Sequence, residues 1–535
     1  MRKNKLWVMV VVVLIGCALW FVTPPKGLQE AGTLADIAKQ ADVRLWEADR
    51  ILSSGANETF EGLDAAAVIR VGKAVATETE KRLSTSTASK PSPPTVPGQR
   101  AWRLFVLFAA TIALILCDAM PIFVAAIGSL AIAILTGVLT TAEGYSGFSA
   151  GFIILIVVAF TIAIGFAKSG LGERLAYMII GRFGKSTLGL AYSLVATDVL
   201  ISPAFPSNTA RSGVLFPIVD SVARSSGSPP EAEARGKVGA FLVMASIIGL
   251  SLSSGLWLTA MAANPAGAEL ASKLIGEEVD FLRWFAASSV PTLLGVVLLP
   301  YLLYRVFPPE VKLTPNAPET AKQRLREMGP PSRDEKVMGG VFLVMIVFWA
   351  LKGVLGVDST AVAIGGLFVL MLTRVVSLED VRGSNGPTTF VWFASLYTLS
   401  KHLNDFGFMH WIGQGAAAWV APFSWPVVYV LLVVAYVLMH YFFVSQTAHM
   451  FAVYPIFLSV GLGAGVPGGL LAIMLLLATN FFSPLTPQAS SANAIFVGSG
   501  YLTMGEVYKY GGITVLAATL IYLVIGTPWI MFVAG

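Results

Sequence analysis

The sequence predicts an all-α polytopic membrane protein, with about 11 transmembrane helices of roughly 20 residues each arranged as two inverted repeats. Composition gives the class, because 56% of the 535 residues are hydrophobic, only 13% are charged and the mean hydropathy is +0.74. Soluble domains carry roughly 25% charged residues. A close series of apolar segments and a polar cluster that occurs twice give the rest of the architecture.

The N-terminus begins with three basic residues followed by an apolar run from Leu6 to Val22. Such a run fits either a secretory signal or a first membrane span, and Leu14-Ile15-Gly16-Cys17 resembles a lipoprotein cleavage box. Trp20, Phe21 and the following prolines look like an interfacial helix end. We therefore expect residues 1–23 to form an uncleaved first transmembrane helix.

Residues 24–100 break the apolar pattern, since they are polar, compatible with helix around 34–52 and 62–83, and end in a linker rich in Ser, Thr and Pro. They contain no His, no Cys and no Gly-rich cluster. We expect an extracytoplasmic helical insert on a tether, and a solvated helical hairpin is favoured over a ligand-binding or sensor module.

From residue 104 onward the apolar segments follow one another at short intervals. They cover about 104–118, 121–138, 150–167, 187–220, 238–262, 284–307, 337–355, 359–376, 389–400, 411–460, 468–500 and 512–533. Two of them, 187–220 and 411–460, have the wrong shape for one span and contain polar clusters near Pro and Gly. Irregular backbone at membrane depth must be buried in protein or line a cavity. Re-entrant helical hairpins are therefore expected at about 175–220 and 411–458.

Charge predicts the orientation of these segments. The loop 308–336 is strongly basic, which assigns it to the cytoplasm; its basic residues are Lys312, Lys322, Arg324, Arg326, Arg333 and Lys336. The segment 264–283 is acidic and is expected outside. The two predicted repeats, 101–307 and 337–535, then have opposite orientation, with the N-terminus inside and the insert and C-terminus outside.

The repeated cluster is the strongest functional signal. Ser207-Asn208-Thr209-Ala210-Arg211 recurs 238 positions later as Ser445-Gln446-Thr447-Ala448-His449, and each is followed at the same spacing by an aromatic-Pro-Ile sequence. Polar residues within a membrane segment are costly and mark functional sites. Their duplication predicts one site built from two halves, an arrangement typical of secondary transporters.

The residue types in the cluster suit a small anion. Hydroxyls, amides and the N-terminal ends of helices replace the hydration of a carboxylate when they are arranged in advance. We predict substrate contacts from Ser207, Asn208, Thr209, Ser445, Gln446 and Thr447. A second pair of matched turns, Leu258-Thr259-Ala260 and Leu485-Thr486-Pro487, adds Thr259, Thr486 and Pro487. The alternative for any single Ser or Thr is a hydrogen bond to its own helix.

Arg211 and His449 occupy equivalent positions, two residues beyond the threonines. A guanidinium is always charged, and a histidine beside an anion tends to be protonated. The two residues are predicted to compensate the charge of the anion in place of sodium, which favours exchange of one anion for another. A snorkelling or acid-paired Arg211 and a helix-packing His449 stay open as alternatives.

These residues resemble a known family. The two Ser-x-Thr clusters, the Thr486-Pro487 turn and Ser491-Ala492-Asn493-Ala494-Ile495 are similar to the divalent anion/sodium symporter superfamily, and closest to its 2-oxoglutarate/malate and citrate/succinate carriers. The resemblance covers roughly residues 100–535. It implies a homodimeric, elevator-type carrier of malate, 2-oxoglutarate, succinate or citrate, with a scaffold domain and a transport domain, in a bacterial inner (plasma) membrane.

The resemblance also leaves an alternative open, a sodium-coupled dicarboxylate or sulfate symporter. Its sodium ligands would be Ser207, Asn208, Ser445 and Gln446. Gln446 stands where sodium-coupled members usually have Asn, which is a departure from their pattern at the second sodium site.

Two other functions, an enzyme and a channel, agree less well with the sequence. An intramembrane enzyme would need acid and base pairs from Asp198, Lys401, His402 and Asp405, but no catalytic motif surrounds them. A channel suits a closed two-tip anion site poorly. We expect no metal centre at the remaining histidines, no cofactor apart from sodium in a symporter, and no nucleic-acid partner. Cys17 and Cys117 lie in apolar runs and indicate neither a disulfide nor a thiolate metal site.

Overall fold

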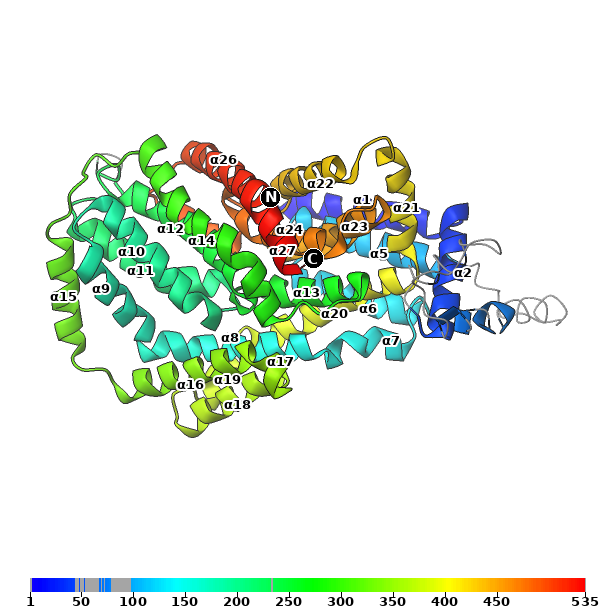
Figure 1. Ribbon diagram of the computed structural model, residues 1–535, viewed down its shortest axis with the longest axis horizontal. Helices are drawn as coiled ribbons and strands as arrows, with labels where there is room; N and C mark the ends of the chain where they lie inside the picture. The colour runs from blue at the N-terminus through cyan, green and yellow to red at the C-terminus, as the bar shows by residue number, and fades with distance from the viewer. Residues whose placement is uncertain are drawn as a thin grey trace. The chain divides into compact units, whose positions relative to one another are not determined.

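The computed structural model describes residues 2–43, 98–231 and 234–534, together with residues 48, 52, 67–68, 70–71 and 73–77 (Figure 1). The described chain folds into helices joined by short turns, with an isolated β-bridge between Ser186 and Leu313. The predicted all-α class is confirmed. The linker-like stretch 84–97 that ends the predicted insert lies outside the described residues.

The described part of the chain contains eight helical segments that are long and apolar enough to cross a membrane. They are Gln99–Leu116, Gly151–Ser169, Thr187–Ala204, Gly239–Leu256, Phe281–Val306, Trp425–Phe442, Gly468–Leu485 and Met504–Val533. Three shorter apolar helices are Trp7–Trp20, Ile122–Leu135 and Ser359–Leu372. The protein is therefore an integral membrane protein, while the number of true spans stays a prediction.

The chain divides into two compact units, and each unit draws on both predicted repeats. The first unit comprises Met1–Phe148, Val391–Ser424 and Pro455–Gly465. Its helices are α1 (Arg2–Trp20), α2 (Lys26–Ala41), α5 (Gln99–Leu116), α6 (Ile122–Leu135), α7 (Thr141–Tyr145), most of α20 (Gly386–Asp405), α21 (Phe408–Val420) and the C-terminal half of α23 (Gln446–Gly463). Within this unit α1 packs on α5, and α2 packs on α21.

The second unit comprises Ser149–Phe390, Trp425–Tyr454 and Val466–Gly535. Its first helices are α8 (Gly151–Ser169), α9 (Leu171–Phe183), α10 (Thr187–Ile201), α11 (Asn208–Ser225), α12 (Gly239–Leu256), α13 (Ala263–Ile275) and α14 (Phe281–Val306). The middle part holds α15 (Ala317–Met328), α16 (Arg333–Ala350), α17 (Lys352–Leu355), α18 (Ser359–Leu372) and α19 (Leu378–Gly383). The last part holds α22 (Trp425–Met439), the start of α23, α24 (Gly468–Phe481), α25 (Ser491–Gly498), α26 (Met504–Ile521) and α27 (Thr527–Ala534).

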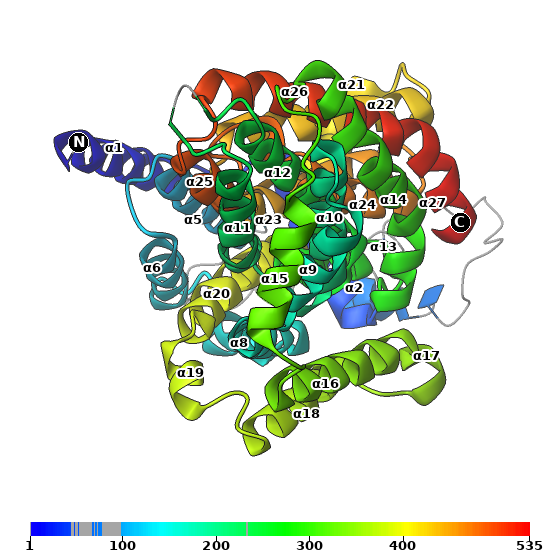
Figure 2. The ribbon, with the colours of Figure 1, turned by 90° about the vertical axis from the view of Figure 1, so that its left-hand side faces the viewer.

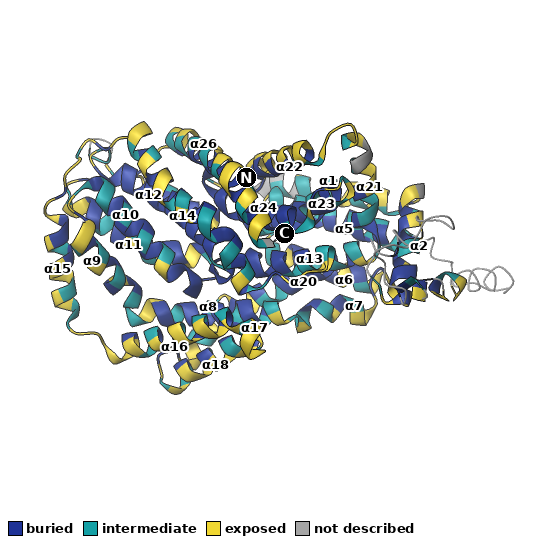
Figure 3. Ribbon diagram, in the orientation of Figure 1, coloured by how far each residue is buried: buried dark blue, intermediate teal, exposed yellow. Residues whose placement is uncertain are grey.

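The core of the second unit lies around α12. Every residue of α12 is buried, and α10, α14 and α24 pack against it (Figures 2 and 3). α12 is apolar all round and rich in Gly, Ala and Ser, so neighbouring helices approach it closely. A Cβ at Gly249 would lie 2.7 Å from the Val195 side chain on α10. By contrast, α16 and α18, which pack together on α8, expose Leu343, Phe368 and other large apolar side chains, as lipid-facing helices do.

A glycine with left-handed backbone precedes each of two amphipathic helices. Gly170 precedes α9 and Gly407 precedes α21, and both glycines are left-handed, with φ of 79° and 81°. This backbone conformation is strained for residues with a Cβ, so both positions require glycine. The match between 168–171 and 405–408 in the sequence thus corresponds to two helix starts of the same local geometry.

Only part of the predicted insert is described. α2 and the described residues beyond it form a small core built from Ile37, Ala41, Ala67 and Val71 with their neighbours. Such small side chains allow close helix packing, which agrees with the helical character expected from the sequence. Its location on the external side stays a prediction.

Candidate functional site

The first hairpin is formed by α10 and α11. A 3-10 turn at Ser202–Ala204 ends α10, and the chain then runs extended through Phe205 to Ser207, which is the N-cap of α11. The Ser207 hydroxyl accepts a hydrogen bond from the Ala210 amide at 3.2 Å. Pro206 favours this break because proline disrupts a continuous helix and the residue before it, here Phe205, prefers extended backbone.

The second hairpin, formed by α22 and α23, repeats this design. A 3-10 turn at His440–Phe442 ends α22, and the Ser445 hydroxyl accepts from the Ala448 amide at 3.3 Å. Ser207 and Ser445 are therefore both helix caps, and each is half-buried. Each cap sits at the positive end of a helix dipole, which favours an anion nearby.

The two tips meet through equivalent residues. The Asn208 side-chain amide donates to Gln446 Oε1 at 3.0 Å, and the two positions are 238 residues apart in the sequence. Gln446 in turn donates to the Thr479 carbonyl at 2.8 Å. Both residues are buried. The two predicted half-sites are thus joined in one place within the second unit.

Two broken helices accompany the hairpins. Asn264 Nδ2 donates to the carbonyls of Ser254 and Trp257 at 2.8 and 3.2 Å. Asn493 Nδ2 donates to the carbonyls of Ser483 and Thr486 at 2.8 and 3.0 Å. The spacing of ten and seven residues is the same in both, so an amide occupies the equivalent place in each break.

This pattern aligns the two breaks differently from the sequence match. The hydrogen bonds pair Trp257 with Thr486, and both residues have extended backbone. The sequence alignment had paired Thr259 with Thr486. The difference of two residues arises because the short motif Leu-Thr matched by residue type, whereas the amide contacts follow the course of the backbone.

The predicted threonines have different surroundings. Thr209 is exposed on α11, and its hydroxyl lies 2.5 Å from the Ser491 hydroxyl at the start of α25. Thr447 is half-buried at the start of α23. The buried Thr259 donates to the Pro203 carbonyl at 2.9 Å, so its hydroxyl stabilises the backbone of the first tip. Of these three threonines, Thr209 and Thr447 are the two that are not buried.

The Thr486-Pro487 turn lies in the second break. Thr486 is fully buried, and its hydroxyl oxygen has no hydrogen-bond partner among the described residues. Pro487 is half-buried beside it. An unpartnered buried hydroxyl is unusual in a folded protein and calls for an explanation.

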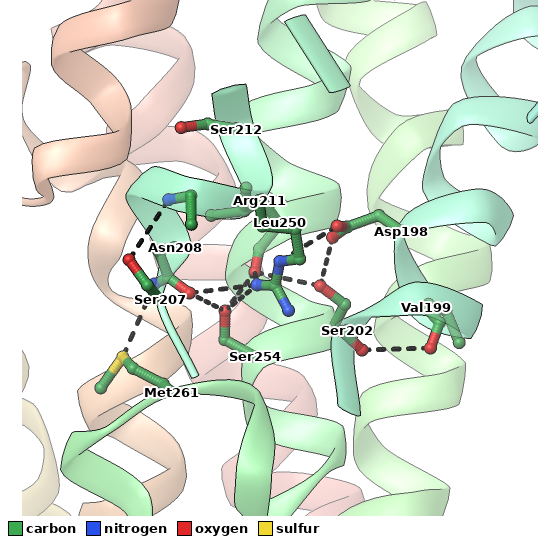
Figure 4. A network of polar contacts seen from close by, with 12 residues as sticks. Asp198, Val199, Ser202, Ser207, Asn208, Arg211, Ser212, Leu250, Ser254 and Met261 are labelled. Carbon is green, nitrogen blue, oxygen red and sulfur yellow. Dashed lines mark hydrogen bonds and ion pairs between the residues drawn. The ribbon is translucent and has the colours of Figure 1, made fainter. Parts of the chain in front are cut away.

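Arg211 is fully buried and forms an ion pair with Asp198, whose carboxylate Oδ1 lies 3.1 Å from Arg211 Nε (Figure 4). Its Nη2 donates to Asn208 Oδ1 at 3.1 Å, to the Leu250 carbonyl at 3.0 Å and to Ser254 Oγ. The acid-paired alternative for Arg211 therefore describes its contacts. Its positive charge is already balanced within the first hairpin.

His449 lies inside the second hairpin, fully buried against Tyr436, Phe443 and Phe482. Its Nδ1 is 3.0 Å from Nδ1 of His440, and His440 Nε2 is 2.9 Å from the Ala489 carbonyl. A carbonyl only accepts, so His440 carries its proton on Nε2 and His449 donates its Nδ1 proton to His440 when both rings are neutral. The described residues leave His449 Nε2 without a partner.

The acid and base residues considered for an enzyme are not gathered in one site. Lys401, His402 and Asp405 lie on one helix, α20, in the first unit. His402 Nε2 lies 3.2 Å from Ser146 Oγ and 3.1 Å from the Glu143 carbonyl, and Lys401 pairs with Asp405 one turn away. Asp198 belongs to the second unit. Among the described residues, no group of three or more His, Cys, Asp or Glu could hold a metal ion.

Several residues of the site were not predicted. Asp198 and Ser254 bind Arg211. Ser491 contacts Thr209. The Tyr436 hydroxyl lies 2.8 Å from the hydroxyl of Thr479, whose carbonyl binds Gln446. Ser491 was within a recognised motif, and an acid inside a membrane hairpin is itself a signal for Asp198. Ser254 carries no such signal, because serine is common in apolar helices.

Comparison with known proteins gives a consistent result. Residues 86–535 match the family described as "Sodium:sulfate symporter transmembrane region". The putative malate transporter YflS of Bacillus subtilis is 40% identical over 432 residues, which cover 80% of this chain and 90% of that protein. The chloroplastic dicarboxylate transporter 1 of Spinacia oleracea is 37% identical over 435 residues, covering 81% of this chain and 76% of that protein.

Two solved structures share the fold. The Alcanivorax borkumensis YdaH transporter superposes with a TM-score of 0.51 at 16% identity, covering 74% of this chain and 89% of that one. Neisseria gonorrhoeae MtrF gives a TM-score of 0.52 at 15% identity, covering 76% and 84%. The resemblance drawn from the Ser-x-Thr motifs is confirmed: the chain belongs to the family of membrane transporters defined by the sodium:sulfate symporter transmembrane region.

Proposed function

We propose that this protein carries small dicarboxylate anions, of the malate, 2-oxoglutarate or succinate type, across a bacterial inner membrane. The observation that carries the proposal is the contact between Asn208 and Gln446, which brings the N-terminal ends of α11 and α23 to one place. Two helix N-termini with half-buried hydroxyls offer donors to both carboxylates of one substrate. The names of the Bacillus subtilis and spinach relatives support the same substrate class.

The substrate contacts belong to this proposal. Ser207, Thr209, Ser445 and Thr447 are the residues whose side chains or helix ends remain accessible at the tips. Thr259 acts from behind, through the backbone of the first tip. In an elevator the second unit, which contains the whole first hairpin and the tip of the second, would be the moving body. The first unit would then be the fixed scaffold, and the protein would act as a homodimer.

The mode of transport depends on charge at the tips. The sequence argument for exchange needed uncompensated positive charge from Arg211 and His449. Asp198 neutralises Arg211, and His449 shares a hydrogen bond with His440. There is therefore less uncompensated positive charge near the tips than the argument for obligatory exchange assumed. Exchange stays a prediction.

Sodium symport is the second candidate, favoured by the family description. Its amide ligands would be Asn208 and Gln446. Both amide oxygens already accept hydrogen bonds, Asn208 Oδ1 from Arg211 and Ser254 and Gln446 Oε1 from Asn208. Sodium could bind these two oxygens only if the hydrogen bonds that they accept were broken.

Uptake of labelled malate into proteoliposomes tests the proposal. We expect saturable uptake that unlabelled 2-oxoglutarate and succinate inhibit and that sulfate does not. Four conditions, with and without internal dicarboxylate and with and without sodium, separate exchange from symport. Absence of dicarboxylate uptake in all four would refute the proposed function.

A further inference from the structure

The buried ion pair in the first hairpin is unusual within this molecule. Asp198 lies on α10 and Arg211 on α11, with side chains 2% and 0% exposed (Figure 4). No other ion pair in the described part of the chain has both partners this deeply buried. An uncompensated buried guanidinium costs several kcal/mol. The carboxylate therefore stabilises Arg211 in this position.

α12 holds both members of the pair from the opposite side. Ser253 Oγ donates to Asp198 Oδ2, and Ser254 Oγ accepts from Arg211. Ser254 also donates to Asn208 Oδ1 at 2.8 Å. The ion pair thus connects to the tip residue Asn208 through a continuous set of hydrogen bonds, and any charge left uncompensated within it would act directly behind the tip.

The second hairpin has no such ion pair. The positions equivalent to Asp198 and Arg211, 238 residues later, are Tyr436 and His449, whose rings lie 4.4 Å apart. The Tyr436 hydroxyl is 2.8 Å from the Thr479 hydroxyl. The acid is therefore specific to the hairpin that contains an arginine, as expected for a counter-charge and not for a general feature of the fold.

Resting on the proposed function, we propose that Asp198 determines the valence of the anion that the site accepts. It cancels the charge of Arg211, so that the first tip presents hydrogen-bond donors and a helix end without a net cation. A dianionic dicarboxylate needs no more than this. A trianion such as citrate, which would gain most from an added positive charge, receives no extra attraction and is disfavoured by the cost of burying its third charge.

The size of the effect follows from the position of Arg211. It lies one helical turn from the cap Ser207, about 6 Å along the axis. Removing the acid leaves a guanidinium that cannot lose its proton. One unit of positive charge at this range in a protein interior strengthens binding of each anionic charge on the order of tenfold. A trianion carries one charge more than a dianion, so the preference for citrate over malate should rise by the same factor.

The test compares Asp198→Asn with Asp198→Glu and with the double variant Asp198→Asn/Arg211→Gln. Dissociation constants for malate and citrate are measured on purified protein at neutral pH, together with inhibition of malate uptake by citrate in proteoliposomes. In Asp198→Asn we expect both anions to bind more tightly and the citrate-to-malate preference to rise about tenfold or more. Asp198→Glu keeps the charge and should keep the original preference. The double variant removes both charges and should return the preference close to that of the parent.

The outcomes separate the possible explanations. Structural damage would weaken both anions in Asp198→Asn, and elution as a single species checks the fold. A lower melting temperature is itself expected for this variant, because it leaves the buried guanidinium of Arg211 without its partner. An unchanged citrate-to-malate preference in a folded Asp198→Asn protein would overturn the role of Asp198, and so would a double variant that keeps the shift. If the parent protein binds neither malate nor succinate, the proposed function fails instead.

Discussion

Asn208 donates to Gln446 across 238 positions of sequence, and each residue follows the serine that caps its own helix. Equivalent residues of the two hairpins therefore touch each other. An internal repeat brings equivalent residues into contact only close to its axis of pseudo-symmetry. The contact thus marks the place where the two half-sites join, and it makes several properties of the protein testable.

The amide contact should couple the two tips energetically. Asn208→Ala and Gln446→Ala each leave a buried polar partner unsatisfied, and each should lower stability by about 1–3 kcal/mol. Because they remove the same hydrogen bond, the double variant should lose less than the sum, with a coupling of about 0.5–3 kcal/mol. Melting of the detergent-solubilised protein and malate affinity are the measurements.

A matched control for this cycle is Tyr429→Phe. Its hydroxyl lies 2.8 Å from Thr527 Oγ1 in the same unit, and Tyr429 lies on α22, eleven residues before the turn that begins at His440. This variant should lower the melting temperature and leave malate affinity unchanged. Additive losses in the Asn208 and Gln446 cycle would contradict the coupling of the tips.

The threonines at the tips should contribute to affinity. Thr209→Val and Thr447→Val keep the shape of the side chain and remove one hydroxyl donor each. A hydrogen bond to a charged group contributes about 1.5–3 kcal/mol, or on the order of tenfold to a hundredfold in dissociation constant. Malate binding to the purified variants measures the change.

Thr259→Val provides the contrast. Its hydroxyl supports the Pro203 carbonyl, so its loss leaves a buried carbonyl unsatisfied and should lower stability by about 1–3 kcal/mol. Malate affinity should change little in the protein that remains folded. The opposite result, with normal affinity in Thr209→Val and Thr447→Val and a large loss in Thr259→Val, would reverse the assignment of direct and supporting residues.

The basic loop 308–336 should face the cytoplasm and the insert should lie outside. Single cysteines at Lys73 and Ser332, both exposed, are introduced into a protein whose Cys17 and Cys117 have been replaced. A membrane-impermeant thiol reagent added to intact cells should label the cysteine at 73 and label the one at 332 only after lysis. Labelling in the reverse order would overturn the predicted inversion of the repeats.

Acid should weaken the attachment of α19 to the end of α8. Lys168 donates to both oxygens of Asp380 at 2.9 and 2.8 Å, and this bond together with the Ser377 amide lowers the pKa of Asp380 from 3.8 to about 2. A lowered pKa in the folded state stabilises the protein above the unfolded value, and the contribution is lost as the pH falls toward the folded value. The melting temperatures of the parent and of Asp380→Asn should therefore differ at pH 6 and converge as the pH falls below about 4.

A conservative variant checks the origin of this effect. The Asp380→Asn change is repeated in two Lys168 variants, and its effect on the melting temperature at pH 6 is compared. Lys168→Arg keeps a positive charge beside Asp380 and should keep this effect. Lys168→Met removes the charge and should remove most of the effect. A difference between the parent and Asp380→Asn that does not depend on pH would show that the ion pair is not its cause.

The sequence by itself determined the class, the all-α fold and the transporter family, because each depends on composition, on the length of apolar segments or on short local motifs. It also located Asn208 and Gln446, since a cluster repeated at the same spacing marks equivalent positions in two halves. Helix caps such as Ser207 and Ser445 are equally local, because a cap bonds to an amide three residues away.

Only the tertiary structure decided what these side chains contact. Arg211 could have faced the anion or an acid, and the packing of α10 against α11 and α12 gives it Asp198. The pairing of Trp257 with Thr486 likewise follows from the hydrogen bonds that the side-chain amides of Asn264 and Asn493 donate, and not from the Leu-Thr dipeptide that the two segments share. The physical reason is that a charge or donor in a low-dielectric interior must be satisfied by whichever group packing brings within 3 Å or so, and that group lies elsewhere in the sequence.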